Sequence, residues 1–260
     1  MSELPSATPE PTRPGRRKLA SLRALGWDEP PATLEVDGRH WSRTALVKHD
    51  FFAATAFYED GSGNKAVLKV GRTIPWCGVP LRWLGRLLRD REVRIYRKLA
   101  DLPNVPKLLG TVGETGFLHA YVEGRPLERG KPVPDGFFAR LEGLLRELHR
   151  RGIAYVDTNK PQNILLGDDG QPYLIDFQIS WDGGPGWLLR RLQREDLYHL
   201  RKHWRRMRPD ELTPEQLAAA RQVGWWVRVH RAVTWPYFRV RRWLFRKLEK
   251  DGRLLPSGSD

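Results

Sequence analysis

The stretch that decides the fold of this chain is YVDTNKPQNIL at residues 155–165, followed by YLIDFQ at residues 173–178. Asp157 is followed six residues later by Asn163, and an aliphatic pair comes next. After a turn that contains glycine, a second aliphatic run ends in Asp176 and a phenylalanine. Taken singly, the two aspartates would be turn residues beside a β-hairpin, and the asparagine would cap a turn. Few unrelated sequences would supply all of these features in this order.

This pattern resembles the catalytic loop and the metal-binding motif of protein kinases and their relatives. The resemblance implies that Asp157 orients and partly deprotonates the hydroxyl nucleophile of a phosphoryl transfer. It also implies that Asn163 and Asp176, both hard oxygen donors, bind Mg²⁺, or alternatively Mn²⁺, beside the nucleotide phosphates. Lys160 would reach the γ-phosphate as a further cation. We therefore expect ATP and Mg²⁺ as cofactors.

Two upstream motifs fit the same resemblance. The sequence AVLK at residues 66–69 is similar to the kinase strand that places a lysine on the α and β phosphates. The sequence REVRIY at residues 91–96 is similar to the helix that carries the glutamate partner of that lysine. Glu92 would keep Lys69 protonated, because a buried lysine without a counter-ion tends to lose its proton. Alone, a lysine at a strand end is usually just solvated, so the order of the motifs is what favours a nucleotide site.

A third motif, FLHAYVEGRPL at residues 117–127, resembles the hinge between the two lobes of a kinase. The resemblance implies that backbone groups near Ala120 and Val122 form hydrogen bonds with adenine. A strand followed by Glu-Gly is common in α/β proteins, so this motif is less specific than the catalytic stretch.

The order of elements along the chain predicts the fold class. Short β-type runs between residues 41 and 70 precede a helical pattern over 81–99, then further strand character, then a long helix at about 136–151. This order is that of a bilobal kinase. We expect an α+β protein-kinase-like fold with a small antiparallel sheet and one αC-type helix in the N-lobe, and a mainly helical C-lobe. The expected boundaries are a flexible leader at 1–32, the N-lobe at 33–122 and the C-lobe at 123–260.

The chain departs from the protein-kinase pattern in several places. The nucleotide-covering loop, VKHDFFA at residues 47–53, has no glycine, although glycines let this loop approach the phosphates in protein kinases. Tyr155 and Val156 replace the usual His-Arg, which argues against control by a phosphorylated activation loop. The segment from Gln178 to Asp196 is short and lacks Ala-Pro-Glu. These departures point to compact relatives: lipopolysaccharide kinases, Rio-type kinases and small-molecule phosphotransferases.

The forms DTNKPQNIL and IDFQ are most similar to the lipopolysaccharide kinases that phosphorylate Kdo or heptose sugars, and the likeness covers roughly residues 44–205. Asp196, in the sequence EDLYHL, resembles the aspartate that braces the catalytic loop in this superfamily. It could equally be a capping carboxylate.

Composition indicates an anionic partner. The chain of 260 residues has a formal net charge of +14, and most of the excess lies in residues 186–250. Tryptophan, leucine and arginine are interleaved at residues 76–91 and again at 224–250, where a basic amphipathic C-terminal helix is expected. Such a helix can bind an anionic membrane or glycolipid, or its apolar face can pack on the C-lobe. Nucleic acid ranks lower, because no recognisable nucleic-acid motif accompanies these residues.

These observations predict a cytoplasmic monomer, peripheral on the inner membrane. No apolar run approaches the length of a membrane span, no signal-peptide pattern is present, and Cys77 is the single cysteine. The leading hypothesis is transfer of the ATP γ-phosphate to a glycolipid sugar at the membrane surface. The alternatives are an atypical serine/threonine protein kinase and a pseudokinase scaffold, the latter suggested by the glycine-free loop.

Overall fold

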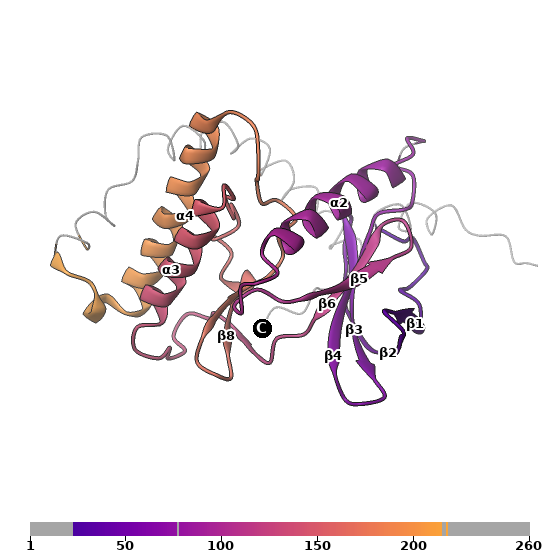
Figure 1. Cartoon of the computed structure of the whole chain (residues 1–260), viewed down its shortest axis with the longest axis horizontal. Coiled ribbons are helices and arrows are strands. Elements are labelled where there is room, and N and C mark those ends of the chain that lie inside the picture. The colour runs from indigo at the N-terminus through magenta and orange to yellow at the C-terminus, as the bar shows by residue number, and fades with distance from the viewer. Residues whose placement is uncertain (1–22, 77, 215–216, 218–260) are drawn as a thin grey trace, which may run out of the picture.

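The computed structural model describes residues 23–76, 78–214 and 217. One lobe is a sheet with a single long helix, and the other is built around two long helices that lie side by side (Figure 1). No helix in the described part of the chain is long and apolar enough to cross a membrane.

The first lobe is a six-stranded sheet in the order β1-β2-β3-β4-β6-β5, with every neighbouring pair antiparallel. Residues alternate between buried and more exposed along β3, which is the pattern of a strand with one covered face. Trp41, Tyr58, Leu68 and Leu118 form part of the apolar cluster on this sheet. The strands are β1 (Thr33–Val36), β2 (Arg39–His49), β3 (Ala53–Asp60), β4 (Lys65–Gly71), β5 (Leu108–Val112) and β6 (Gly116–Ala120).

Helix α2 (Arg82–Lys98) packs against this sheet, and the ring of its buried Tyr96 contacts Phe117 and His119 of β6. Its N-terminal half comes very close to the end of β4, because a side chain at Gly85 would clash with the backbone of Arg72. Glycine at this position therefore sets how closely the helix approaches the sheet.

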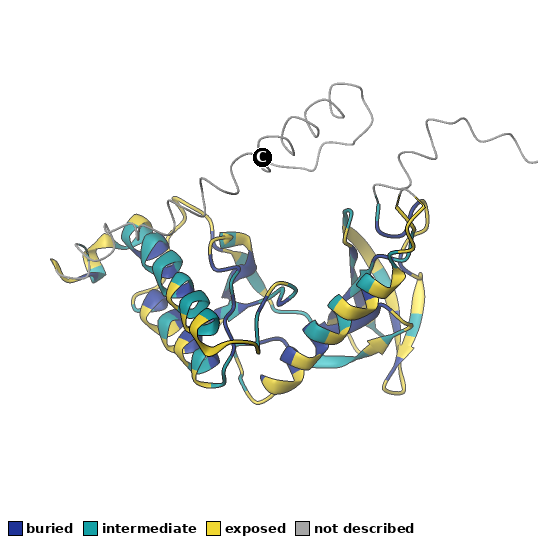
Figure 2. Ribbon diagram, turned by 90° about the horizontal axis from the view of Figure 1, so that it is seen from above, coloured by how far each residue is buried: buried dark blue, intermediate teal, exposed yellow. Residues whose placement is uncertain are grey.

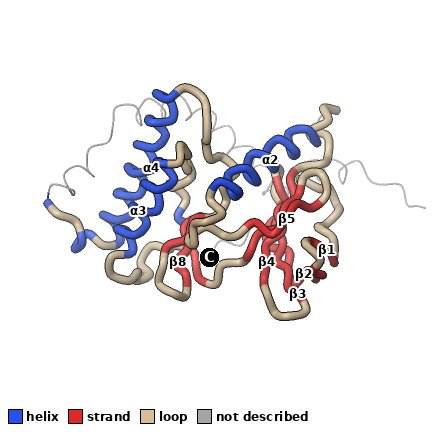
Figure 3. The backbone as a smooth tube through the Cα atoms, viewed as in Figure 1, coloured by secondary structure: helices blue, strands red, loops and turns tan. Residues whose placement is uncertain are grey.

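The second lobe contains α3 (Phe137–Arg150) and α4 (Gly186–Met207), which pack on each other (Figures 1 and 3). A small antiparallel sheet in the order β7-β8-β9 lies between these helices and the first lobe. Its strands are β7 (Gly124–Pro126), β8 (Ile164–Gly167) and β9 (Pro172–Leu174). The described part of this lobe also contains the short 3₁₀ helices η1 (Pro161–Asn163) and η2 (Pro209–Glu211).

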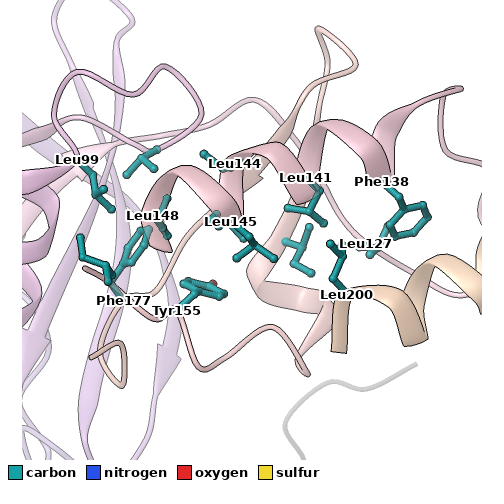
Figure 4. Close-up of a cluster of buried hydrophobic side chains, with 14 of the residues drawn as sticks. Leu99, Leu127, Phe138, Leu141, Leu144, Leu145, Leu148, Tyr155, Phe177 and Leu200 are labelled. Atoms are coloured by element: carbon teal, nitrogen blue, oxygen red, sulfur yellow. The ribbon is translucent and has the colours of Figure 1, made fainter. Parts of the chain in front are cut away.

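The main apolar core joins the two lobes. Leucines of α3 and Leu200 of α4 form its centre (Figure 4), and buried residues line the inner faces of both helices (Figure 2). At the lobe boundary, the ring of Phe177 lies edge-on to Tyr96 at 5.1 Å and to Tyr155 at 5.3 Å. These aromatic contacts connect α2 with the segment that carries Asp157 and the segment that carries Asp176.

Residues 23–32, which the sequence places in a flexible leader, pack on the first lobe. Ala24 and Leu25 are buried, and the Tyr58 hydroxyl donates to the Pro31 carbonyl oxygen at 2.5 Å. Residues in this stretch therefore contact the first lobe. The amphipathic helix expected near the C-terminus lies outside the described residues.

Candidate active site

Lys69 on β4 and Glu92 on α2 form a buried ion pair. The Lys69 Nζ lies 3.0 Å from Oε1 and 2.9 Å from Oε2 of Glu92, whose side chain is only 2% exposed. The Phe177 N–H also donates to Glu92 Oε1 at 3.1 Å. The glutamate therefore links the helix to the sheet and to the segment that follows β9.

Asp176 completes a three-membered charge cluster, because its Oδ1 lies 2.6 Å from Lys69 Nζ. Burial alone would lower the pKa of Lys69, but the carboxylates of Glu92 and Asp176 raise it above its usual value. Burial raises the pKa of Glu92 to about 7, against the opposing effect of Lys69. Burial would also raise the pKa of Asp176, yet Lys69 keeps it below its ordinary range. The lysine is thus held cationic, and Asp176 is held anionic.

Asp157 lies at the centre of a second cluster. Its Oδ2 accepts hydrogen bonds from Lys160 Nζ and from Asn163 Nδ2, each at 2.7 Å. The side chain of Asp157 is buried, whereas that of Lys160 is half exposed at 51%. The structure therefore brings Asp157, Lys160 and Asn163 together, and the lysine head remains accessible from solvent.

The backbone around Asp157 is held by Asp196 of α4. The buried carboxylate of Asp196 accepts hydrogen bonds from the N–H groups of Tyr155 and Val156 and from Thr158 Oγ1, each at 2.8 Å, and lies 3.1 Å from His149 Nε2. Val156 has a φ of 68°, a strained conformation for a β-branched residue. Asp196 thus braces the loop that carries Asp157, and it does not cap its own helix.

Asn163 and Asp176 are suited to hold a divalent cation. The two residues are neighbours in space, since the Ile175 N–H donates to the Asn163 carbonyl at 3.1 Å. The side-chain amide of Asn163 donates to Asp157, which leaves its Oδ1 unengaged, and Asp176 Oδ2 accepts no hydrogen bond from the described residues. No group of three His, Cys, Asp or Glu in that part of the chain is arranged as a metal site. Two hard oxygens of this kind would suit Mg²⁺.

In the segment expected to be the hinge, some of the backbone groups that could bind adenine already have hydrogen-bond partners. The Ala120 N–H donates to the Lys107 carbonyl at 2.8 Å, and the Ala120 carbonyl accepts a hydrogen bond from His119 Nδ1 at 2.9 Å. Burial lowers the pKa of His119 to about 4, so the ring is neutral and carries its proton on Nδ1. The Val122 N–H donates to no described residue. Val122 and the second lone pair of the Ala120 carbonyl are therefore the groups left for a ligand.

In the glycine-free loop, the carboxylate of Asp50 binds backbone amides of the loop itself. Asp50 Oδ1 accepts the backbone N–H groups of Phe52 at 2.8 Å and Ala53 at 2.9 Å, while Lys48 lies 2.7 Å from Oδ2. The Arg72 guanidinium lies 4.0 Å from the centre of the Phe51 ring and donates to the Phe51 carbonyl, which fixes the turn. The loop amides that would face phosphates in a glycine-rich loop thus already bind a carboxylate.

Sequence reasoning missed two features of this site. The first is that Asp50 binds the loop amides. The only sequence signal for this contact is an aspartate two residues before the amide that it binds, and many ordinary Asx turns share that pattern. Phe52 and Ala53, whose amides bind Asp50, line a pocket together with Lys69, Glu92 and Gln178. The second missed feature is a set of contacts between α2 and residues 180–182.

Comparison with known proteins supports a kinase-like assignment over part of the chain. No family model matches the chain. A probable cAMP-dependent protein kinase catalytic subunit of Encephalitozoon cuniculi is 32% identical over 114 residues, which cover 37% of this chain and 35% of that protein. The serine/threonine-protein kinase UCN of Arabidopsis thaliana is 33% identical over 126 residues, which cover 42% of this chain and 30% of that protein. A probable SapB synthase of Streptomyces coelicolor is 27% identical, with 61% and 20% covered. The chain thus spans about a fifth to a third of the length of these relatives.

Solved structures show the fold. The Rio2 kinase of Chaetomium thermophilum, in a complex with ADP, Mg²⁺ and phosphoaspartate, superposes with a TM-score of 0.54 at 18% identity, covering 70% of this chain and 62% of that one. The BubR1 kinase domain superposes with a TM-score of 0.50 at 17% identity, covering 70% and 66%. The chain therefore has a bilobal α+β protein-kinase-like fold, and a Rio2 kinase is among its structural neighbours.

Proposed function

We propose that this chain is an ATP-dependent phosphotransferase that moves the γ-phosphate to a serine or threonine hydroxyl of a protein. The observation that carries the proposal is the convergence of Lys69 and Glu92 with Asp176, while Asn163 links Asp176 to Asp157. Phosphoryl transfer requires charge stabilisation and a carboxylate that orients the nucleophile, and these residues supply both.

Each residue has a distinct role in this proposal. Lys69 binds the α and β phosphates, and Glu92 keeps the lysine charged and oriented. Asn163 and Asp176 hold Mg²⁺, with Mn²⁺ as an alternative, and the cation would neutralise charge on the phosphate oxygens. Asp157 accepts the proton of the acceptor hydroxyl, and Lys160 contacts the γ-phosphate. The backbone of Ala120 and Val122 binds adenine. The ADP and Mg²⁺ in the Rio2 complex support the choice of nucleotide and metal.

A protein acceptor is favoured because the curated relatives at or above 29% identity are named as protein kinases. The test is incubation of the purified chain with labelled ATP and Mg²⁺, separately with a mixture of basic proteins and with core lipopolysaccharide. We expect phosphoserine or phosphothreonine by mass spectrometry. Transfer to lipopolysaccharide alone would exclude the protein acceptor. Binding of Mg-ATP without transfer to any acceptor would indicate a pseudokinase scaffold and overturn the proposal.

A glycolipid sugar at a membrane surface is a second candidate acceptor, favoured by one surface of α2. Trp83 and Leu87 are 58% and 56% exposed, and the basic side chains of Arg82 and Arg86 lie on the same helix. Exposed tryptophan and arginine on one helix suit an anionic bilayer interface. Sedimentation with phosphatidylglycerol vesicles tests this candidate: binding that Trp83→Ser and Leu87→Ser abolish would support it, and no binding would remove it.

Replacing Lys69 with methionine is expected to abolish stabilisation by Mg-ATP. Saturation at about 100 times the dissociation constant stabilises a protein by about 2.7 kcal/mol, which is readily visible as a thermal shift. Methionine keeps the length of the side chain but removes the cation that would bind the phosphates. Lys107→Met, at an exposed site in the same lobe, is the control and should retain the shift. An undiminished shift in Lys69→Met would remove the lysine from the nucleotide site.

Replacing Asp50 with alanine is expected to lower the KM for ATP several-fold. The change frees the Phe52 and Ala53 amides and removes a negative charge from the loop, so that both amides can bind phosphate oxygens. Asp50→Asn is the matched control, because it removes the charge but keeps an oxygen acceptor on the two amides. Steady-state kinetics with varied ATP measures the effect. An unchanged or higher KM in Asp50→Ala would show that these amides do not face the nucleotide.

A further inference from the structure

The segment after Asp176 is short and passes directly beneath α2. Only residues 177–185 separate Asp176 from the start of α4 at Gly186. The segment is tied to the catalytic loop, because Trp181 and Ala154 exchange two backbone hydrogen bonds of 2.8 Å and Ser180 Oγ donates to the Tyr155 carbonyl at 2.9 Å. Its position is therefore fixed relative to Asp157.

Asp182 on this segment forms ion pairs with two basic side chains of α2. Arg94 makes a bidentate contact, with Nε 2.9 Å from Oδ2 and a terminal nitrogen 2.7 Å from Oδ1. Lys98, one helical turn later, lies 2.8 Å from Oδ2. The side chain of Asp182 is only 5% exposed, whereas the side chains of Arg94 and Lys98 are about half exposed to solvent. Bidentate charge-assisted pairs of this kind are among the stronger hydrogen bonds in proteins.

A third cation of the same helix extends this contact. Arg91 donates to the Ser180 carbonyl oxygen, and its guanidinium lies 4.9 Å from the centre of the Trp181 ring. Arg91, Arg94 and Lys98 have the spacing of residues on one helix face. The C-terminal half of α2 is thus held against residues 180–182. We call this set of contacts, made by Arg91, Arg94 and Lys98 with residues 180–182, the clamp.

The clamp acts on the same helix that presents Glu92. Glu92 reaches Lys69 and the Phe177 N–H from the turn that also carries Arg91. In protein kinases the lysine–glutamate pair forms only when this helix is correctly placed, and a phosphorylated activation loop commonly controls that placement. In this chain the carboxylate of Asp182 pairs with basic residues of the helix. The Arg94 contact lowers the pKa of Asp182 to about 2, so this anion is permanent at neutral pH.

We propose that Asp182 is a positioning residue that fixes α2 and thereby keeps Glu92 paired with Lys69, without any phosphorylation of the chain. This inference rests on the proposed function for its kinetic consequence, and on the structure alone for its effect on α2. The Asp182 carboxylate does not touch the reacting groups. It acts through the helix, and loss of its charge leaves Arg94 and Lys98 facing each other without a counter-ion.

The first test compares Asp182→Asn with Asp101→Asn by hydrogen–deuterium exchange of α2. Asp101 is a matched control, because it also makes a bidentate pair with an arginine, Arg151, and its pKa is likewise lowered to about 2. We expect faster exchange within α2 in Asp182→Asn only. Equal α2 exchange in the wild-type protein and Asp182→Asn would overturn the inference, whether or not the chain proves to be a kinase.

The second test is kinetic. Asp182→Asn should lower kcat/KM for ATP about tenfold, and Asp182→Glu should recover most of it, because the longer carboxylate can still reach both flexible cations. Arg94→Gln, at an exposed side chain, serves if Asp182→Asn does not fold, and should show the same loss. Wild-type protein treated with a phosphatase should keep its full kcat. Wild-type kinetics in both clamp variants, or loss of activity after phosphatase treatment, would contradict the proposal.

Discussion

Replacement of Asp157 with asparagine is expected to reduce phosphate transfer by about 10²- to 10⁴-fold, the range typical of a lost general base. Asp157 Oδ2 is occupied by Lys160 and Asn163, which orients the carboxylate and leaves Oδ1 for the acceptor hydroxyl. Asparagine has almost the same shape but cannot accept the proton. The measurement is single-turnover transfer of the labelled γ-phosphate.

Nucleotide binding separates this catalytic effect from a folding defect. The thermal shift with Mg-ATP should persist in Asp157→Asn, because Lys69 and Asp176 remain in place. Asp168→Asn, in the exposed turn between β8 and β9, is the control and should transfer phosphate at the wild-type rate. Full activity in Asp157→Asn would remove Asp157 from its proposed role.

Replacement of Asp196 with alanine is expected to destabilise the fold by about 3–5 kcal/mol, because three donors lose their buried acceptor and each such loss costs about 1–3 kcal/mol. The Tyr155 and Val156 amides and the Thr158 hydroxyl would lose their acceptor in a region closed to water. The strained backbone at Val156 would also lose its support. The loss should appear as a lower midpoint of urea denaturation.

Asp210 provides the control for this stability measurement. Its carboxylate pairs with Arg208 at the surface, with 61% of the side chain exposed. Asp210→Ala should therefore leave the urea midpoint close to the wild-type value, because exposed ion pairs contribute little to stability. If the two alanine variants unfold at the same urea concentration, Asp196 does not brace the catalytic loop.

The fold was predictable from the sequence because its signals are local. The spacing from Asp157 to Asn163 and the aliphatic run before Asp176 each lie within a dozen residues, and residue type alone indicates their chemistry. The pairing of Lys69 with Glu92 is a longer-range contact, yet the order of motifs predicted it, and the two side chains meet. The roles of these residues in catalysis and binding remain predictions for the experiments above.

The clamp could not be predicted in the same way. Arg94 and Lys98 look like ordinary solvated charges on a helix, and their partner Asp182 lies more than 80 residues away in the sequence. Only the packing of α2 against the short segment after Asp176 brings them together. The Asp50 contact was equally hidden, since it depends on a side-chain rotamer within a turn. The sequence therefore showed a loop without glycine, but not the carboxylate that binds its amides.

A crystal structure of the chain with Mg²⁺ and a non-hydrolysable ATP analogue tests the account most directly. We expect a metal ion that contacts both Asn163 and Asp176, with the nucleotide phosphates beside Lys69 and adenine at Val122. A nucleotide bound on another face, or a metal ion that touches neither Asn163 nor Asp176, would contradict it.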